Sequence, residues 1–344
     1  MVSKNKINRR DFIQQSATVI GAGVVGGISR RAGAVDALDH RNERTDKMKY
    51  RKLGRTNFMT SQLIFGCGAA LIGGKAVRLL DRAFEAGINY YDVGSNDYYK
   101  GAEQHLAAFA KRHHGDIWIT SKGYARSSEE HAMGDDVSVA YAKSAAKYWL
   151  NLVDGSLKDL QSGYIDAYLI QGFNEPSLLR SEEMIRAFEK VKTDGTVGHV
   201  GVSTHQNAQA VVEEAIASGI CDLVMVAVTP AGWYDWKKRQ MLAGTPSLRE
   251  LKPVLDKARA AGIGLIGMKA GRLIAPVTSA GKGDDSAFNA FYDQRLLKAP
   301  LTPHQRSYAF VVEHGLDAVN ADMQNFKHFE ENLHAVRTAH TYFA

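Results

Sequence analysis

The chain has 344 residues, a formal net charge of +6 and only two cysteines. Two cysteines make no disulfide framework, and Cys67 and Cys221 both lie in apolar runs, where each is most simply a small core residue. Residues 1–34 alone carry a net charge of +5, so the rest of the chain is almost neutral and does not indicate nucleic-acid binding.

Residues 1–34 are expected to be an export leader. Arg9 and Arg10 precede an apolar pair and a weakly apolar, Gly/Ala-rich run, which ends at three small residues, 32–34. This order resembles a twin-arginine signal peptide; the alternative is a basic tail that stays attached. The run is shorter than the roughly 20 apolar residues that span a bilayer, so stable membrane insertion is not expected.

The leader divides the chain into three expected parts. Residues 1–34 are the signal peptide, residues 35–47 a linker and residues 48–344 a single folded domain. The twin-arginine export machinery is then an expected partner. The folded protein is expected in the periplasm, or otherwise exported by that route.

Residues 48–344 predict a barrel. Lys49 to Leu53, a turn at 54–57 and Phe58 to Gln62 predict a β-hairpin. Eight short apolar runs then predict strands at 63–66, 88–92, 117–121, 165–170, 200–203, 223–228, 264–268 and 316–319. Most are separated by segments with helical spacing. This repeat predicts an α/β fold, a (β/α)8 TIM barrel whose bottom is closed by the N-terminal hairpin.

Two connections are longer than a barrel needs, at 229–251 and 270–302. Long loops after strands often carry function, although a solvated insertion explains them equally well. Aromatic residues of the expected barrel mouth could form a wall for a flat or cyclic substrate, or a small core of the loops themselves. These residues are Tyr124, Phe173, Trp233, Tyr234 and Trp236.

Polar residues stand at the carboxyl ends of four predicted strands: Asp92, Lys122, Gln171 and Ser203. In a barrel these ends meet at one face, where active sites lie. A lysine ammonium beside a phenol stabilises the phenolate, so Lys122 could let Tyr98 or Tyr99 donate a proton near neutral pH. Such an acid suits carbonyl reduction. The alternatives are a surface aromatic pair and an ordinary buried ion pair.

Seven segments, in this order and spacing, resemble the aldo-keto reductases across almost all of residues 48–344. They are KYRKLGRT with LIFGCG, GINYYDVG, WITSK, SLKDLQSGYIDAYLIQ, KTDGTVGHVGVSTH, GIGLIGMKAG and FEENL. The resemblance implies a barrel that binds NADP or NAD in extended form without a Gly-rich Rossmann loop. It also implies reduction of an aldehyde, ketone or sugar carbonyl, or the reverse oxidation.

By this resemblance, the catalytic residues are Asp92, Tyr98, Lys122 and Gln171. The family's tyrosine lies five residues after its aspartate, where this chain has Asp97, so a one-residue shift brings either Tyr98 or Tyr99 into place. The spacing to Gly101 favours Tyr98, with Tyr99 as the alternative acid.

The family's usual histidine is replaced by Gln171, which can donate a hydrogen bond but cannot relay a proton near neutral pH. His205 is expected to be a loop histidine, although it could reach the same face.

The resemblance also assigns cofactor-binding residues: Gly66, Ser203, Thr204, Lys269, Gly271, Arg272, Glu331 and Asn332. Ser203 would contact the nicotinamide amide, and Lys269 and Arg272 the phosphates. Asp322 and Gln324 stand where the family often has glycine and arginine for the adenosine phosphate, so the choice between NADP and NAD stays open. No metal site is predicted.

Three functions are consistent with these residues. The first is an NAD(P)-dependent reductase of a small-molecule carbonyl. The second is a catalytically impaired nucleotide- or ligand-binding sensor, which the departures at Gln171, Thr204, Met225 and Asp322 favour. The third is a lyase or isomerase that uses bound nucleotide without net turnover. An exported reductase would have to leave the cytoplasm with its nucleotide bound.

Overall fold

The computed structural model describes residues 37–132, 135–275 and 283–343. The predicted leader, residues 1–34, lies outside these residues. The chain divides into two units after residue 37, and Leu38–Ala344 is the unit described below.

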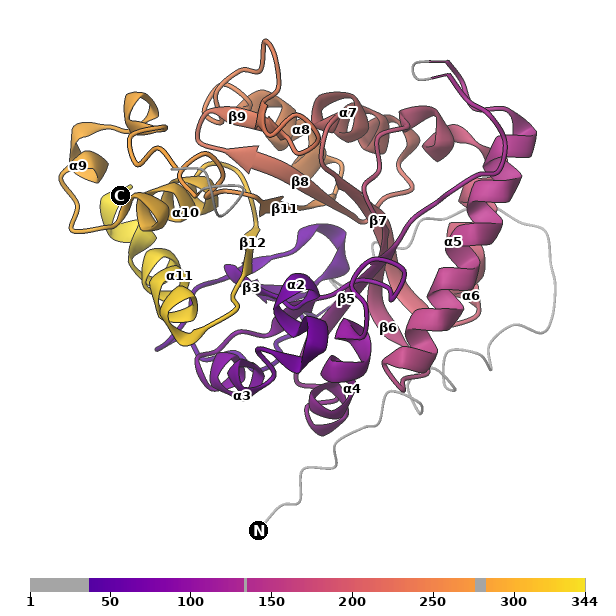
Figure 1. Ribbon diagram of the computed structural model, residues 1–344, viewed down its shortest axis with the longest axis horizontal. Coiled ribbons are helices and arrows are strands. Elements are labelled where there is room, and N and C mark those ends of the chain that lie inside the picture. The colour runs from indigo at the N-terminus through magenta and orange to yellow at the C-terminus, as the bar shows by residue number, and fades with distance from the viewer. Residues whose placement is uncertain (1–36, 133–134, 276–282, 344) are drawn as a thin grey trace, which may run out of the picture. The chain divides into compact units, whose positions relative to one another are not determined.

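Eight parallel strands form a closed barrel (Figure 1). The strands are β3 (Leu63–Gly66), β4 (Tyr90–Asp92), β5 (Trp118–Gly123), β6 (Ile165–Ile170), β7 (Val197–Thr204), β8 (Leu223–Thr229), β11 (Gly264–Met268) and β12 (Ala318–Asp322). They pair in the order β8, β11, β12, β3, β4, β5, β6 and β7, and pairing of β7 with β8 closes the ring. The predicted TIM barrel is therefore confirmed.

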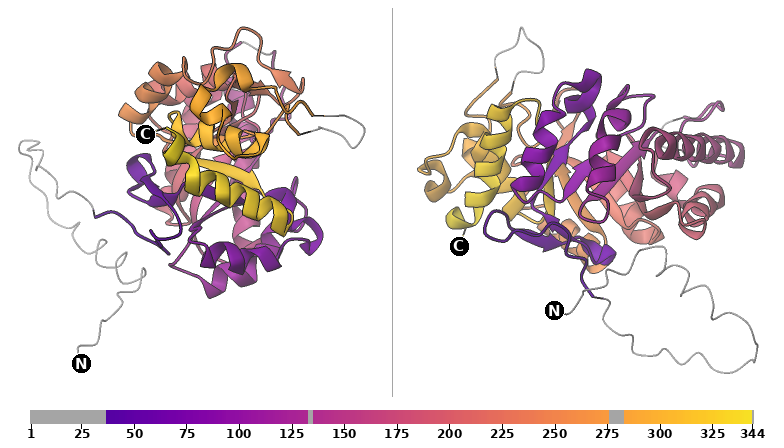
Figure 2. Two further views of the ribbon diagram at one scale, coloured as in Figure 1. Left: turned by 90° about the vertical axis from the view of Figure 1, so that its left-hand side faces the viewer. Right: turned by 90° about the horizontal axis from the view of Figure 1, so that it is seen from below.

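Helices surround the strands, and α10 and α11 lie side by side (Figure 2). The helices are α2 (Gly68–Leu71), α3 (Arg78–Glu85), α4 (Ala102–Arg112), α5 (Val139–Asp159), α6 (Glu182–Thr193), α7 (Ala208–Ser218), α8 (Lys252–Ala260), α9 (Gln294–Leu297), α10 (Pro303–Glu313) and α11 (Phe326–Thr338). Several begin at the hydroxyl cap that their sequence offers. Thr302, for example, forms a capping box with Gln305 at the start of α10.

The predicted hairpin is present at the amino ends of the barrel strands. Strand β1 (Tyr50–Lys52) pairs antiparallel with β2 (Met59–Ser61) around a 3₁₀ turn. After the turn, Phe58 stacks on Trp118, the first residue of β5, with ring centroids 4.7 Å apart. The hairpin thus plugs the barrel bottom with aromatic surface.

Residues 38–47, part of the expected linker 35–47, pack against this end of the barrel. Arg41 is buried, and its Nη1 donates to Asp166 Oδ1 at 2.8 Å and to the Ile117 carbonyl at 2.9 Å. A buried guanidinium needs such partners, and here they tie the first residues of the folded unit to the barrel.

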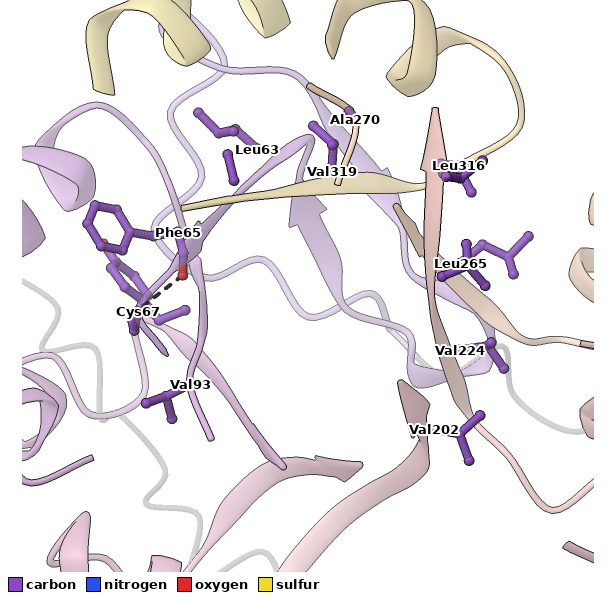
Figure 3. Packing of buried hydrophobic residues seen from close by; sticks show 14 of the residues in the cluster. Leu63, Phe65, Cys67, Val93, Val202, Val224, Leu265, Ala270, Leu316 and Val319 are labelled. Atoms are coloured by element: carbon purple, nitrogen blue, oxygen red, sulfur yellow. Dashed lines mark hydrogen bonds between the residues drawn. The ribbon is translucent and has the colours of Figure 1, made fainter. Parts of the chain in front are cut away.

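The core has two layers, because successive strand residues point to opposite sides. Leu63, Phe65 and Val319 belong to the layer between strands and helices, part of which Figure 3 shows together with the buried, unpaired Cys67. Ile64 between them belongs to the smaller cluster inside the barrel. Inward positions therefore recur every second residue, and the last one of each strand faces the carboxyl end of the barrel.

The connection after β8 folds into an antiparallel hairpin of β9 (Gly232–Asp235) and β10 (Gln240–Met241), which extends the sheet at β8. Trp233, Tyr234 and Phe173, three of the predicted mouth residues, are almost fully buried: Trp233 and Phe173 belong to the layer between strands and helices, and Tyr234 to the cluster inside the barrel. None of the described helices is long and apolar enough to cross a bilayer.

Candidate active site

A pocket of about 580 Å³ opens at the carboxyl ends of the strands. This volume lies in the range of small-molecule sites. Most of the predicted site residues line it: Gly66, Asp92, Tyr99, Lys122, Gln171, Ser203, Lys269, Gly271, Arg272, Glu331 and Asn332. Tyr98 and Thr204, both predicted, are not among the described residues that line it.

Asp92 and Lys122 form a buried ion pair at the floor of this pocket. Lys122 Nζ donates to Asp92 Oδ1 at 2.6 Å, to Asp92 Oδ2 at 2.7 Å and to the Val93 carbonyl at 2.6 Å. Asn320 Nδ2 donates to the same carboxylate at 2.5 Å. Every second side chain of these strands points into the barrel. Asp92 lies two residues after the inward-facing Tyr90, and Lys122 two residues after Thr120. Each is therefore the last inward-facing side chain of its strand, and the two meet at the carboxyl end of the barrel.

Tyr99 lies at the pocket and Tyr98 does not. Both backbone amides donate to the Ser95 carbonyl in a tight turn, which sends the two rings in different directions. Tyr98 is 45% exposed and packs edge-on against Tyr99, with centroids 4.6 Å apart. The geometry therefore favours the alternative acid, Tyr99, over Tyr98.

Two glycines make room for the Tyr99 ring. A Cβ atom on Gly68 would lie 2.7 Å from that ring, and so would one on Gly94. Contacts this short do not occur, so any larger residue at either position would move the ring.

The expected activation of the phenol by Lys122 is not seen. Within the described residues, no hydrogen bond joins Lys122 to either tyrosine, because its three donors go to Asp92 and Val93. Burial, followed by the charge of Asp92, raises the pKa of Tyr99 well above its usual value. Tyr99 is thus fully protonated at neutral pH, and the ion pair keeps Lys122 from acting on it directly.

Gln171 and Ser203 present unused polar atoms. Gln171 Oε1 and Ser203 Oγ are buried and have no hydrogen-bond partner among the described residues. Unsatisfied buried polar atoms are rare in folded proteins and often mark a place where a ligand binds. The Thr204 hydroxyl is also buried without a partner, but it does not reach this pocket.

His205, expected to be a loop histidine, lines the same pocket. Its backbone carbonyl accepts from Trp236 N–H at 2.9 Å, which holds the residue against the β9–β10 hairpin. Burial, and then the charges of Lys269 and Lys122, lower the pKa of His205 to about 3. The imidazole is therefore neutral at physiological pH and can donate one hydrogen bond and accept another.

Two cations lie further along the pocket, just after β11. Lys269 is partly buried, and burial together with the nearby Arg272 lowers its pKa to about 8. Lys269 has a φ of 70°, a left-handed conformation that is uncommon for a residue with a side chain. Lys269 and Arg272 are thus two neighbouring cations in one pocket, an arrangement that suits a multiply charged anion.

The far end of the pocket is lined from α10, β12 and α11. Asp322 accepts from Gln324 Nε2 at 2.8 Å, and Glu331 accepts from the Thr302 hydroxyl at 2.7 Å. Two carboxylates therefore face this end, with His304, Tyr308 and His328 beside them. In the part of the chain that the structure describes, no three metal-ligating side chains are grouped to hold a metal ion.

Sequence reasoning missed Asn320. Asn320 is the third residue of β12, after Ala318 and Val319, and its side chain faces inward. The predicted strand ended at residue 319, which left Asn320 outside it. A polar residue directly after an apolar run was the available signal.

Known proteins share the sequence pattern of this chain. The sequence model described as the aldo/keto reductase family matches residues 66–338. The chain is 32% identical over 160 residues to the uncharacterized oxidoreductase YqkF of Bacillus subtilis (strain 168). That match covers 46% of this chain and 49% of YqkF, so it spans about half the length of this relative.

Solved structures share the fold. The holo form of aldo-keto reductase AKR11C1 from Bacillus halodurans superimposes with a TM-score of 0.59 at 21% identity, over 84% of this chain and 91% of that one. An aldo-keto reductase from Klebsiella pneumoniae, solved in complex with NADPH, gives a TM-score of 0.57 at 19% identity, over 84% and 90% of the two chains.

Proposed function

This chain belongs to the aldo/keto reductase family, and we propose that it is an NAD(P)-dependent oxidoreductase that reduces the carbonyl of a small molecule or oxidises the corresponding alcohol. One observation carries the proposal. A protonated phenol, Tyr99, lines the same pocket as the buried Asp92–Lys122 pair and the unsatisfied side chain of Gln171.

The residues of the pocket fit a nicotinamide nucleotide. The unpaired oxygens of Ser203 and Gln171 can accept from a carboxamide N–H₂ group, and Lys269 and Arg272 can bind phosphate oxygens. The neighbour from Klebsiella pneumoniae was solved with NADPH, which supports the same class of cofactor here. When bound, the reduced nucleotide supplies the hydride that reduces the carbonyl carbon.

The protein's own residues handle the oxygen of the substrate. Tyr99 donates its proton to that oxygen, which is the task of a general acid. The Gln171 amide and the neutral His205 imidazole can each donate a hydrogen bond to the same oxygen as negative charge develops. Lys122, whose donors are taken by Asp92 and Val93, holds the floor of the pocket in place beneath the reacting atoms and does not contact the phenol.

The ends of the pocket give preferences within this function. Asp322 and Glu331 at the far end disfavour an additional phosphate, so we propose that NADH is preferred to NADPH. For the substrate we propose an aldehyde, ketone or sugar. Tyr98 and Tyr124, whose rings pack edge-on with centroids 5.9 Å apart, are not among the described residues that line the pocket.

We also propose that the protein works in the periplasm, or otherwise outside the cytoplasm, after export by the twin-arginine machinery. The support is the Arg9-Arg10 pair with the weakly apolar run and small residues that follow it. That machinery carries folded proteins, so the nucleotide would travel in its pocket.

Two substitutions test the function. A panel of aldehydes, ketones and sugars is assayed with NADH and NADPH, following nucleotide absorbance. We expect Tyr99→Phe to lower kcat on the order of 10²- to 10³-fold, because it removes the proton donor at the reacting oxygen. The matched variant Tyr98→Phe should change kcat by less than about threefold, since that hydroxyl is outside the pocket.

The same assay separates the alternatives. A nucleotide-binding sensor would bind NADH without oxidising it, and a lyase or isomerase would form product without an absorbance change. Equal activity of Tyr99→Phe and the unmodified protein would remove the proposed role of Tyr99.

A further inference from the structure

Three cationic side chains surround the indole of Trp236. The distances to the ring centroid are 3.6 Å from Arg239 Cζ, 4.3 Å from Lys269 Nζ and 4.7 Å from Arg272 Cζ. All three fall within the range of cation–π attraction, for which tryptophan is the best ring. Lys269 and Arg272 follow β11, whereas Trp236 and Arg239 come from the β9–β10 hairpin.

No carboxylate pairs directly with this cluster. In the described part of the chain, none of the three cations forms an ion pair or a side-chain hydrogen bond to an acidic residue, and the charges of Asp322 and Asp92 act on Lys269 only from a distance. Like charges gathered in this way repel one another, and Arg272 helps to lower the pKa of Lys269 to about 8, after burial. The cluster is therefore a positively charged site that an anion with several oxygens would complete.

The hairpin is anchored beside the pocket. The backbone N–H of Trp236 donates to the backbone carbonyl of His205, a pocket residue, at 2.9 Å. At its tip, Asp235 Oδ1 accepts from Lys238 N–H at 2.9 Å, and Arg239 has a left-handed φ of 59°. A side-chain residue seldom adopts that conformation, so the turn itself holds Arg239 at the indole.

We propose that the β9–β10 hairpin is a clamp for the diphosphate of a bound nucleotide, in which Trp236 and Arg239 add to Lys269 and Arg272. The inference rests on the proposed nucleotide-dependent function and extends it to how the nucleotide is retained. The two negative charges of the diphosphate offset most of the charge of the three cations, and its contacts with the hairpin have to break before it can leave. The clamp therefore slows release, which an exported enzyme requires to keep its nucleotide.

The test measures release and equilibrium binding. Purified protein loaded with NADH is mixed with excess ADP in a stopped-flow instrument, and the loss of bound-NADH fluorescence gives the release rate. We expect Arg239→Met and Trp236→Phe each to speed release by about tenfold, since most changes of affinity appear in the off-rate. Lys238→Met, one residue away in the same hairpin, is the control of equal charge and should release NADH at the unmodified rate.

Titration with ADP and with adenosine shows whether the two substitutions weaken contacts with the phosphates or with the nucleoside. Both clamp variants should bind ADP about tenfold more weakly and adenosine equally well, because adenosine has no phosphate. Unchanged release in Arg239→Met and Trp236→Phe, or an equal acceleration in Lys238→Met, would overturn the clamp while leaving nucleotide binding intact. Failure of the unmodified protein to bind NADH or ADP would overturn the clamp and the proposed function together.

Discussion

In the proposed function, Gln171 and His205 can both donate a hydrogen bond to the substrate oxygen, where the family usually has a single histidine. Gln171 occupies the carboxyl end of β6 but cannot carry a proton, and His205 approaches the same pocket after β7 as a neutral imidazole. Its pKa of about 3 results first from burial and then from two lysines, so the pocket holds it uncharged across the physiological range. A neutral hydrogen-bond donor polarises a carbonyl without first gaining or losing a proton.

His205→Asn is expected to lower kcat/KM about tenfold, the size of one lost hydrogen bond to the substrate oxygen. Because the pKa of His205 is lowered to about 3, the rate should show no step near pH 6.5 that belongs to it. A pH profile of kcat/KM between 5 and 8 checks both points. A step near pH 6.5 that disappears in His205→Asn would mean that the charged imidazole is the active form.

Glu103 gives a prediction about stability. It is 1% exposed, its Oε1 accepts from the Ser121 hydroxyl at 2.5 Å, and burial raises its pKa from 4.5 to about 7. The folded-state pKa lies above the unfolded value, so its stabilising contribution is complete below pH 4.5. That contribution is lost as the pH rises through about 7.

Between pH 5 and pH 8 the unmodified protein should therefore lose about 2 to 3 kcal/mol of unfolding free energy relative to Glu103→Gln, which has no proton to lose. Urea unfolding of both proteins at the two pH values measures the difference. The same pH dependence in both would show that Glu103 is not the group responsible.

At the scale of elements, the turn after β4 and the start of α2 together position Tyr99, the proposed general acid. The Tyr99 ring lies against Gly68, the first residue of α2, and against Gly94. Gly68→Ala should therefore displace the ring and reduce kcat on the order of 10²-fold, the effect of a misplacement of about 1 Å.

Gly155→Ala is the matched control, because Gly155 lies inside α5 and a Cβ there would have no neighbour within 4 Å. It should leave kcat unchanged and raise the unfolding free energy by about 0.5 to 1 kcal/mol, since alanine is the better helix former. Steady-state kinetics and urea unfolding of both variants measure these effects. Full activity of Gly68→Ala would show that the ring tolerates the shift.

These elements also show what sequence can and cannot predict. Strand periodicity predicts which residues face the barrel interior, so the amino-acid pattern alone places Asp92, Lys122 and Gln171 in one site. The choice between Tyr98 and Tyr99 depends on two backbone hydrogen bonds to Ser95, which no periodicity encodes. Asn320 was missed for a related reason, because strand ends are the least certain part of any such prediction.

Contacts between residues far apart in the sequence are even harder to predict. Arg41 belongs to a polar segment that predicts a linker, and only its burial against Asp166, 125 residues away, makes it part of the barrel. The cations that meet at Trp236 likewise come from two separate connections. Each connection is recognisable as a long loop, but their meeting depends on the closed ring of strands.

For the whole molecule, the distribution of charge along the chain is consistent with the proposed export and removal of residues 1–34. A net charge of +5 is concentrated in residues 1–34, whereas the barrel, the pocket and the clamp all lie in the unit Leu38–Ala344. Removal of a leader would therefore leave an almost neutral protein with its binding site complete.

Export with bound nucleotide is the prediction that belongs to this scale. We expect protein recovered from the periplasm to carry close to stoichiometric nucleotide, because the clamp slows its release.

Joint substitution of Arg9→Lys and Arg10→Lys should keep the protein in the cytoplasm, folded and loaded, since the paired arginines are the recognised signal. The matched control, Lys4→Arg with Lys6→Arg, preserves charge outside the pair and should be exported normally. Cell fractionation with chromatography of the nucleotide released by acid measures both. Periplasmic protein that arrives empty, although the cytoplasmic form is loaded, would mean that the nucleotide is lost on the way and that retention is not what the hairpin provides.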